Sequence, residues 1–304
     1  MANIRGGVFT LKLAYRLKKD NNWFDLNDVW VAPSPSGAQT RYSDGAPPTP
    51  NTGYFGGGIT TVTVATMDKV TYSTDTTAAV PGANLSLARQ LVAATGNSTN
   101  GYFGGGNIPA VVTTMDKVTY SSDTTAAVPG ANLSVARYGT GATGNLTNGY
   151  FGGGFPVTAQ MDKVTYSTDT RVAVPGANLS LSRAYLGATG NSTNGYFGGG
   201  FTPAVVTTMD KVTYSTDTTA AVPGANLSVA RYLPAATGNS TNGYFGGGNI
   251  GASSLVDKIQ YSTDTRLAAI PGLNFSSARA KPSASSARAN AIPTTGFAPV
   301  PNIV

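Results

Sequence analysis

The sequence lacks three residue types that carry much of enzyme chemistry. It has no cysteine and no histidine, and all 14 acidic residues are aspartate because glutamate is also absent. These absences exclude thiolate nucleophiles, histidine bases, disulfides and zinc sites built from Cys and His. No D-x-D cluster suited to calcium occurs either. We therefore expect a protein that is not an enzyme and has no cofactor or metal.

Long apolar runs are also missing. No stretch approaches the roughly 20 residues that a membrane-spanning helix needs, and residues 1–22 lack the apolar core of a secretory signal peptide. The formal net charge is +6, but Lys and Arg are spread singly, and only Lys18 and Lys19 are adjacent. We expect a solvated basic surface, with no membrane span, no signal peptide and no nucleic-acid partner.

The chain is rich in a repeated motif. "GYFGGG" begins at Gly53, and its first glycine recurs at intervals of 48, 48, 46 and 48 residues. An Arg stands 12 residues before each of these glycines, and Arg279 opens a sixth unit. Periods of this length are typical of propellers and solenoids. Abundant Gly, Thr, Ser, Asn, Val and Tyr favour strands joined by turns, so the sequence predicts an all-β repeat protein.

Each unit contains four candidate strands. In the second unit these are residues 89–96, 101–106, 115–121 and 126–130. The Asn-Gly pair before the second strand is a strong hairpin signal, and the third strand alternates in character. The proline in the fourth fits an edge strand. Four antiparallel strands with a short edge strand are typical of one propeller blade.

The repeat resembles a known family. "LARQLVAATGNSTNGYFGGG" followed by "MDKVTYSTDT" is similar to the kelch repeat, and the likeness covers about residues 39–290. The Trp that kelch blades usually carry on the fourth strand is absent, and "TTAAV" stands in its place. The resemblance is therefore to a kelch-like repeat, and it implies a β-propeller of four-stranded blades.

The terminal segments determine how many blades are expected. We divide the chain into an N-terminal segment (1–38), five kelch-like repeats (39–276) and a C-terminal closing segment (277–304). Residues 28–33 resemble a fourth strand, and a first strand is expected after Arg279. These strands predict six blades, the last built from both termini, which would remove open edges. The alternative is five blades with a separate N-terminal docking arm.

Several repeated residues are expected to be structural. Gly105, Gly106 and their copies should allow close strand approach and positive φ, since no helix follows them to form a phosphate loop. Tyr102 and Phe103 should pack on opposite sides of their strand, between blades. Asp75 and its copies should hydrogen-bond their own turns. The repeated arginines should each pair with an Asp of a neighbouring turn or blade: Arg89, Arg137, Arg183 and Arg231.

The copies differ mainly in two places, the link after the glycines and the residues just after the Arg. Strand direction alternates within a blade, so both places should lie at the same end, where loops on a rigid scaffold often carry recognition. Drift in tolerant loops is the alternative explanation. The candidate partner-binding residues of this variable end are Tyr138, Phe155, Phe201, Tyr232, Ile108 and Ile250.

A second resemblance concerns function. The stretch "NIRGGVFTLKLAYRLK", a downstream Trp and the arrays of "NGYFGGG" and "DKVTYSTDT" resemble tail or virion-associated proteins of tailed bacteriophages, especially marine ones. This implies a non-enzymatic structural and binding protein of the tail or fibre, assembled in the host cytoplasm and involved in assembly or host attachment. Its partners would be other virion subunits or copies of itself, and a host cell-surface polysaccharide or protein. A lectin-like carbohydrate-binding propeller and a polysaccharide lyase or hydrolase are the alternatives.

Overall fold

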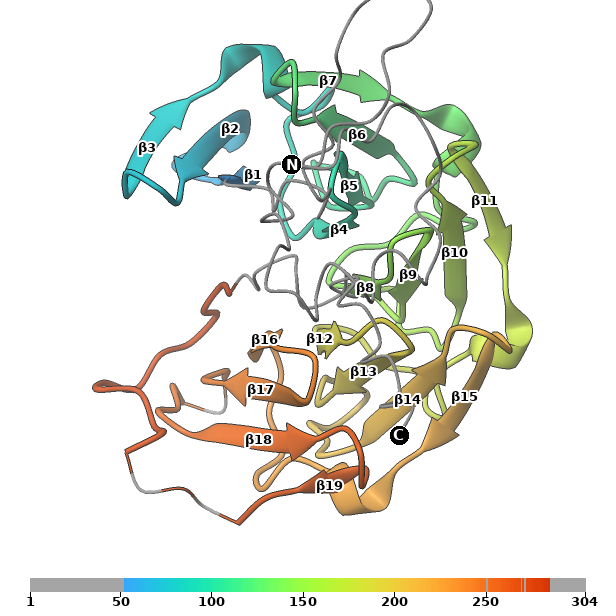
Figure 1. Cartoon of the computed structure of the whole chain (residues 1–304), viewed down its shortest axis with the longest axis vertical. Helices are drawn as coiled ribbons and strands as arrows, with labels where there is room; N and C mark the ends of the chain where they lie inside the picture. The colour runs from blue at the N-terminus through green and yellow to red at the C-terminus, as the bar shows by residue number, and fades with distance from the viewer. Residues whose placement is uncertain (1–51, 250, 269, 271, 285–304) are drawn as a thin grey trace, which may run out of the picture. The chain divides into compact units, whose positions relative to one another are not determined.

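Five antiparallel sheets make up the described part of the chain (Figure 1). The computed structural model describes residues 52–249, 251–268, 270 and 272–284. Four sheets have four strands each, in the order of the chain, and the first has three. The predicted all-β fold is confirmed: the sheets are the blades of a β-propeller.

The blades are numbered in chain order. Blade 1 contains β1 (Thr52–Ile59), β2 (Thr63–Thr71) and β3 (Thr76–Ala79). Blade 2 contains β4 (Ala93–Gly96), β5 (Asn100–Gly104), β6 (Met115–Thr119) and β7 (Thr124–Ala127). Blade 3 contains β8 (Gly141–Gly144), β9 (Asn148–Gly152), β10 (Met161–Thr165) and β11 (Thr170–Ala173). Blade 4 contains β12 (Gly187–Gly190), β13 (Asn194–Gly198), β14 (Met209–Thr213) and β15 (Thr218–Ala221). Blade 5 contains β16 (Ala235–Gly238), β17 (Asn242–Gly246), β18 (Val256–Gln260) and β19 (Thr265–Arg266).

The first two strands of a blade are joined by a turn that its own side chains hold. In blade 2, Asn97 Oδ1 accepts hydrogen bonds from the backbone N of Thr99 and of Asn100, each at 2.9 Å. This local bonding fixes the turn of "GNSTNG" and therefore the register in which Gly96 faces Gly101. The hairpin predicted from this sequence is confirmed.

The fourth strand lies earlier in the sequence than predicted. It covers Thr124–Ala127 in blade 2, whereas the prediction placed it at residues 126–130. Pro129 has no N–H with which to continue the ladder, and it starts a short 3-10 helix instead. The same helix follows the last strand of blades 1 to 4: η2 (Pro81–Ala83), η3 (Pro129–Ala131), η4 (Pro175–Ala177) and η5 (Pro223–Ala225).

The described sheets number five, which is the alternative to six given above. The strand predicted at residues 28–33, with the rest of the N-terminal segment (1–38), lies outside the described residues. A strand was also expected after Arg279. Residues 280–284 are described and do not form a strand, and residues 285–304 lie outside the described residues.

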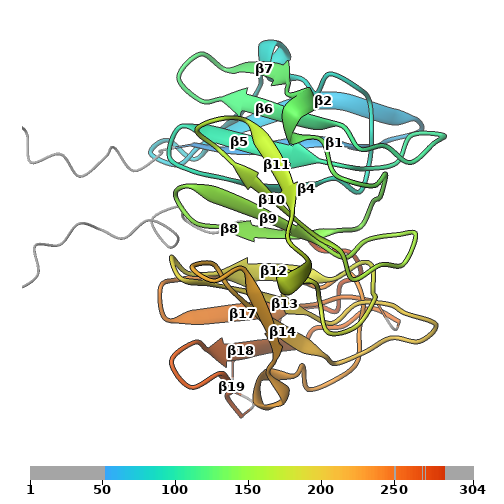
Figure 2. The same cartoon turned by 90° about the vertical axis from the view of Figure 1, so that its right-hand side faces the viewer.

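The first strands of the blades lie innermost. Strand β8 contacts β4 on one side and β12 on the other, and β12 in turn contacts β16. Figure 1 shows these four strands toward the inside and β7, β11 and β15 toward the outside. Seen from the side, the connecting loops gather at the two ends of the strands (Figure 2). Loops from different blades are thereby brought together at each end.

The core lies between the blades, as the alternation in "GYFGGG" predicts. Tyr102 on β5 stacks on Tyr166 of blade 3 with ring centroids 4.8 Å apart. Phe103, the next residue, points to the other side and packs in a cluster with Met67 of blade 1. One strand therefore supplies an aromatic ring to the interfaces on both sides of its blade.

A carboxylate also connects each of blades 2 to 5 to the blade before it. Tyr150 on β9 donates a hydrogen bond of 2.6 Å to Asp217 of blade 4, and Lys163 on β10 forms an ion pair with the same carboxylate. The expectation that these aspartates serve their own turns was wrong, because their side chains reach the preceding blade. The other described contacts of this kind use Tyr54 and Lys69 with Asp123, Tyr102 and Lys117 with Asp169, and Tyr196 and Lys211 with Asp264.

Acid is expected to weaken the contact between blades 1 and 2. Burial alone would raise the pKa of Asp123, but the hydrogen bonds from Lys69 and Tyr54 and the charge of Lys69 together lower it below its ordinary value of 3.8. Such a carboxylate stabilises the fold above its unfolded-state pKa, and this stabilisation is lost as the pH falls through the lower folded-state pKa. We expect Asp123→Asn to reduce the acid sensitivity of the free energy of unfolding below about pH 4.

Urea denaturation of wild type and variant at a series of pH values from 7 down to 2.5 measures this effect. Asp75→Asn is the matched control, because Asp75 occupies the same position in blade 1 and is exposed. Equal acid dependence in wild type and Asp123→Asn would contradict the expected role of Asp123.

Candidate functional site

The two variable segments of each repeat lie next to each other at one end of the blade. In blade 3, Tyr138 precedes β8 and forms a backbone bridge with Phe155, which follows β9. This arrangement agrees with the prediction from alternating strand direction. The corresponding bridges in the other blades are Gln90 with Asn107, Ala184 with Phe201, and Tyr232 with Asn249.

Four of the six candidate binding residues belong to a single series of aromatic contacts. The rings of Tyr138 and Phe155 have centroids 5.3 Å apart, and those of Phe201 and Tyr232 are 6.1 Å apart. Tyr185 connects the two pairs, since its ring lies 5.9 Å from Tyr138 and 6.0 Å from Tyr232. We call these five residues the aromatic patch.

The sequence prediction missed Tyr185, although the variable segment that contains it was recognised. Its signal was its position two residues after the repeated Arg, where the other copies carry Ser, Leu, Gly or Lys. Of the other candidates, Ile108 lies half-buried in the link of blade 2, where its backbone N donates to Ala110 O at 3.1 Å. Ile250 lies outside the described residues.

Tyr185 is one of five equivalent residues, which we call the mouth residues. They have left-handed backbone conformations: Leu91 (φ 55°), Gly139 (62°), Tyr185 (58°), Leu233 (54°) and Lys281 (52°). Tyr185 N donates to Gly139 O at 2.6 Å, and Leu233 N donates to Tyr185 O at 2.6 Å, so the backbone connects neighbouring blades here. A non-glycine residue in this conformation is strained by about 1–3 kcal/mol. Blades 2, 4 and 5 and the segment after blade 5 thus carry side chains where glycine would fit with less strain.

A cavity of about 380 Å³ lies at these residues. The described residues of its wall supply aromatic rings, aliphatic side chains, one amide and one ammonium group, and none of them carries a carboxylate. Asn249 Nδ2 donates a hydrogen bond of 2.8 Å to Tyr232 Oη, so the amide is held against the ring that it neighbours. The lining residues of this mouth cavity are Leu91, Tyr185, Phe201, Tyr232, Leu233, Asn249 and Lys281.

Burial and contact with Tyr138 raise the pKa of Tyr185 above its ordinary value. Burial is the larger cause, and the side-chain hydrogen bond and charge interaction with Tyr138 add to it. Tyr185 is therefore a neutral phenol at physiological pH, able to offer an aromatic face and a hydroxyl group.

The repeated arginines fix the backbone from which the mouth residues project. Arg183 is fully buried and donates to Asp210 at 2.9 Å and to Phe197 O at 3.0 Å. The expected pairing with an Asp is confirmed, but Asp210 lies on β14 of the same blade and not in a neighbouring turn or blade. Burial lowers the pKa of Arg183, and Asp210 partly offsets this effect. Tyr185 lies two residues after Arg183, so the buried ion pair holds the backbone next to Tyr185 in place.

The other blades repeat this ion pair. The pairs are Arg89 with Asp116 at 3.0 Å, Arg137 with Asp162 at 2.9 Å and Arg231 with Asp257 at 2.7 Å. Each of these arginines also donates to the carbonyl of the Phe in "GYFGGG" of its own blade. The first, second and third strands are therefore joined at the variable end of every blade from the second to the fifth.

Gly105 and Gly106 lie beside this anchor, in the positions expected for structural glycines. Their φ values are 65° and 114°, and a Cβ added to Gly105 would lie only 2.4 Å from Arg137 O of the next blade. Gly106 N donates to that same oxygen at 3.0 Å. The glycines are needed because the backbones of neighbouring blades meet here.

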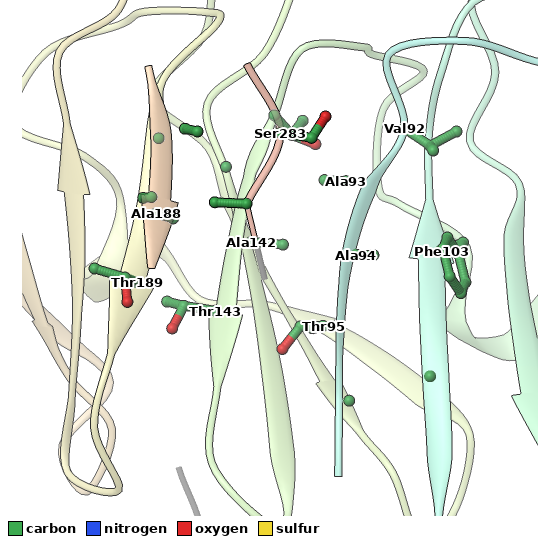
Figure 3. A pocket seen from close by; sticks show the side chains of 18 of the residues that line it. Val92, Ala93, Ala94, Thr95, Phe103, Ala142, Thr143, Ala188, Thr189 and Ser283 are labelled. Carbon is green, nitrogen blue, oxygen red and sulfur yellow. The ribbon is translucent and has the colours of Figure 1, made fainter. Parts of the chain in front are cut away.

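The inner strands line a second and larger space, of about 470 Å³ (Figure 3). Its wall consists mainly of Gly, Ala and Thr, and Thr95, Thr143 and Thr189 lie at corresponding positions on neighbouring strands. Thr143 Oγ1 lies 3.1 Å from Tyr214 Oη, which turns the threonine toward the blade interior. Burial raises the pKa of Tyr261, the corresponding residue of blade 5, to about 12, although its hydrogen bond with Thr189 lowers it. This space is therefore lined mainly by small side chains, and the hydroxyl groups of Thr143 and Thr189 already have tyrosine partners.

The described residues contain no group of three or more His, Cys, Asp or Glu side chains that could hold a metal ion. Within the same part of the chain, no helix has the length and apolar character to cross a membrane.

The fold and the site together define a β-propeller with an aromatic and cationic cavity at its variable end. No model of a known protein family matches the chain, and no curated protein matches it.

Proposed function

We propose that the chain is a non-enzymatic binding and structural propeller that contacts a partner through its variable end. One observation carries the proposal: side chains that differ between otherwise similar copies come together around the mouth cavity. The aromatic patch contains residues from blades 3, 4 and 5. Aromatic residues are typical anchors of binding sites, and their collection at one end favours recognition over drift.

The engagement of the aspartates supports a non-catalytic role. In blades 2 to 5 the aspartate of the third strand is bound to a buried arginine. The aspartates of the next turn accept hydrogen bonds from Tyr and Lys of the preceding blade. Carboxylates held in this way serve the fold, whereas a lyase or hydrolase needs an acid or base directed at substrate.

The resemblances in the sequence support a more specific setting. A kelch-like repeat and a likeness to tail-associated bacteriophage proteins favour a virion component of the tail or fibre, acting in assembly or host attachment. In this setting the uniform end, formed by the "GNSTN" and "TDTT" turns, contacts virion subunits or further copies of the chain. The variable end then faces the host surface.

Quantitative mass spectrometry of purified phage particles tests the virion setting. We expect the protein at a fixed copy number per particle, retained through density-gradient purification. Presence in the lysate but absence from the particles would overturn this setting.

Carbohydrate binding independent of a virion is the second candidate, and the aromatic patch favours it. Purified protein would then bind glycans equally well without any other phage component. Turnover of a polysaccharide on incubation would instead contradict the non-enzymatic proposal.

A further inference from the structure

The mouth residues provide one backbone frame that carries four residue types. All five have a φ between 52° and 62°, whereas the residue is Leu at two positions and Gly, Tyr or Lys at the others. Gly139 shows that the frame accepts glycine. The backbone therefore does not require the side chains of the other four residues. Because a left-handed backbone is strained at a residue other than glycine, these side chains indicate a role other than stabilising the fold.

The chemistry of the mouth cavity restricts its ligand. Among the described residues that line it none carries a carboxylate, so a cationic ligand has no ionic partner on them. Lys281 supplies the one ammonium group of this described lining, which is a poor match for a polyphosphate. A wholly apolar ligand would leave Lys281 and Asn249 without partners from the ligand. The ligand that remains has an apolar face, several hydroxyl groups and one negative charge.

We propose that the mouth cavity binds an acidic saccharide unit, a pyranose that carries a carboxylate. The C–H face of the sugar would lie on the rings of Tyr185 and Tyr232. Its hydroxyl groups would bond to Asn249, and its carboxylate would pair with Lys281. The volume of about 380 Å³ lies within the range of about 300–1,000 Å³ that is typical of small-ligand sites. This inference rests on the proposed function, because it assigns a ligand to the variable end.

The repeat itself supplies a variant that separates binding from folding. Tyr185→Gly places in blade 4 the residue that blade 3 has at this position, so the backbone conformation is retained. Leu146→Ser is the matched control at the uniform end, since Leu146 is exposed and the copies in blades 2, 4 and 5 have Ser at this position.

The full chain is tested on an array of glucuronate-, galacturonate- and sialate-containing oligosaccharides and their neutral counterparts, and titration calorimetry follows for the bound ones. We expect binding of acidic members, and a loss of affinity of at least about tenfold in Tyr185→Gly without a lower thermal midpoint. Lys281→Gln should reduce the affinity for the acidic sugar to that for its neutral counterpart. Leu146→Ser should bind as wild type does.

Binding of no acidic glycan, or binding unchanged in Tyr185→Gly, would overturn the saccharide proposal. Adsorption of phage particles to host cells distinguishes this failure from that of the proposed function. If no glycan binds but Tyr185→Gly impairs adsorption, the saccharide is wrong and the variable end remains the binding surface. If Tyr185→Gly affects neither, both proposals are overturned.

Discussion

Replacing Asp162 by Ala is expected to lower the free energy of unfolding by about 3–5 kcal/mol, because it leaves a buried guanidinium without its counter-ion. Asp162 and Arg137 are both fully buried. The carboxylate accepts a hydrogen bond of 2.9 Å from Arg137 and another of 2.9 Å from Ser134 N. Ser134 N would lose this acceptor, and Arg137 would keep the neutral carbonyl of Phe151 as an acceptor but lose its charged partner. The midpoint and slope of urea denaturation measure the loss.

Asp68→Ala is the matched control for this variant. Asp68 occupies the same place in the "MDKVTYS" of blade 1, but it is exposed. We expect its replacement to change stability by no more than about 0.5 kcal/mol. A loss as large as that of Asp162→Ala would mean that Asp68 is paired and buried in solution, and equal small effects would show that the buried ion pair contributes little.

Replacing Phe197 by Ala is expected to lower the free energy of unfolding by about 3–5 kcal/mol, because it opens a cavity between two blades. Phe197 is fully buried in the cluster that joins blades 3 and 4. A Cβ on Gly152 of blade 3 would lie 3.2 Å from its ring, which shows how closely the backbone of that blade approaches. Such a site has little freedom to collapse around a smaller side chain.

Phe55→Ala is the corresponding control, in the same "GYFGGG" motif. Phe55 is 50% exposed, whereas Phe197 is 0% exposed. We expect Phe55→Ala to lower stability by less than about 1 kcal/mol, as measured by the same denaturation experiment. A loss equal to that of Phe197→Ala would contradict the exposure of Phe55 and indicate that another segment covers this side of blade 1.

Both pairs of variants bear on the candidate site. Arg137, the partner of Asp162, stands two residues before the mouth residue Gly139, and Phe197 lies on β13 of the blade that carries Tyr185. We expect Asp162→Ala and Phe197→Ala to disorder the mouth residues along with the core. Binding studies on destabilised variants should therefore be compared with Tyr185→Gly, which changes the site and leaves the anchor in place.

The part of the site that could be predicted followed from local rules. The period, the hairpin at Asn100 and the alternation of Tyr102 and Phe103 all depend on neighbours in the sequence. Alternating strand direction then placed Tyr138 near Phe155. The position of Tyr185 was different, because a left-handed tyrosine has no local signal: the usual sign of that conformation is glycine, and only Gly139 shows it.

The aspartates of the turns, Asp75 and its copies, also have contacts that the local sequence could not predict. The recurrence of Asp75 and its copies indicated a turn, and the positive φ of these residues agrees with one. The side chain, however, binds Tyr and Lys from a blade more than 50 residues earlier. Nothing in the turn sequence specifies that partner, because it depends on how two blades are placed against each other.

The sequence by itself determined the repeat, the strand order of a blade and the end at which the copies differ, since each is a consequence of chain direction and side-chain alternation. Only the tertiary structure decided which copy of a repeated residue is buried and therefore contributes strongly to stability. Phe55 and Phe197 stand in one motif, as do Asp68 and Asp162, yet one of each pair is exposed and the other buried. Whether a side chain is buried depends on the blade that packs against it. Identical residues therefore contribute different amounts to the free energy of unfolding when their neighbours differ.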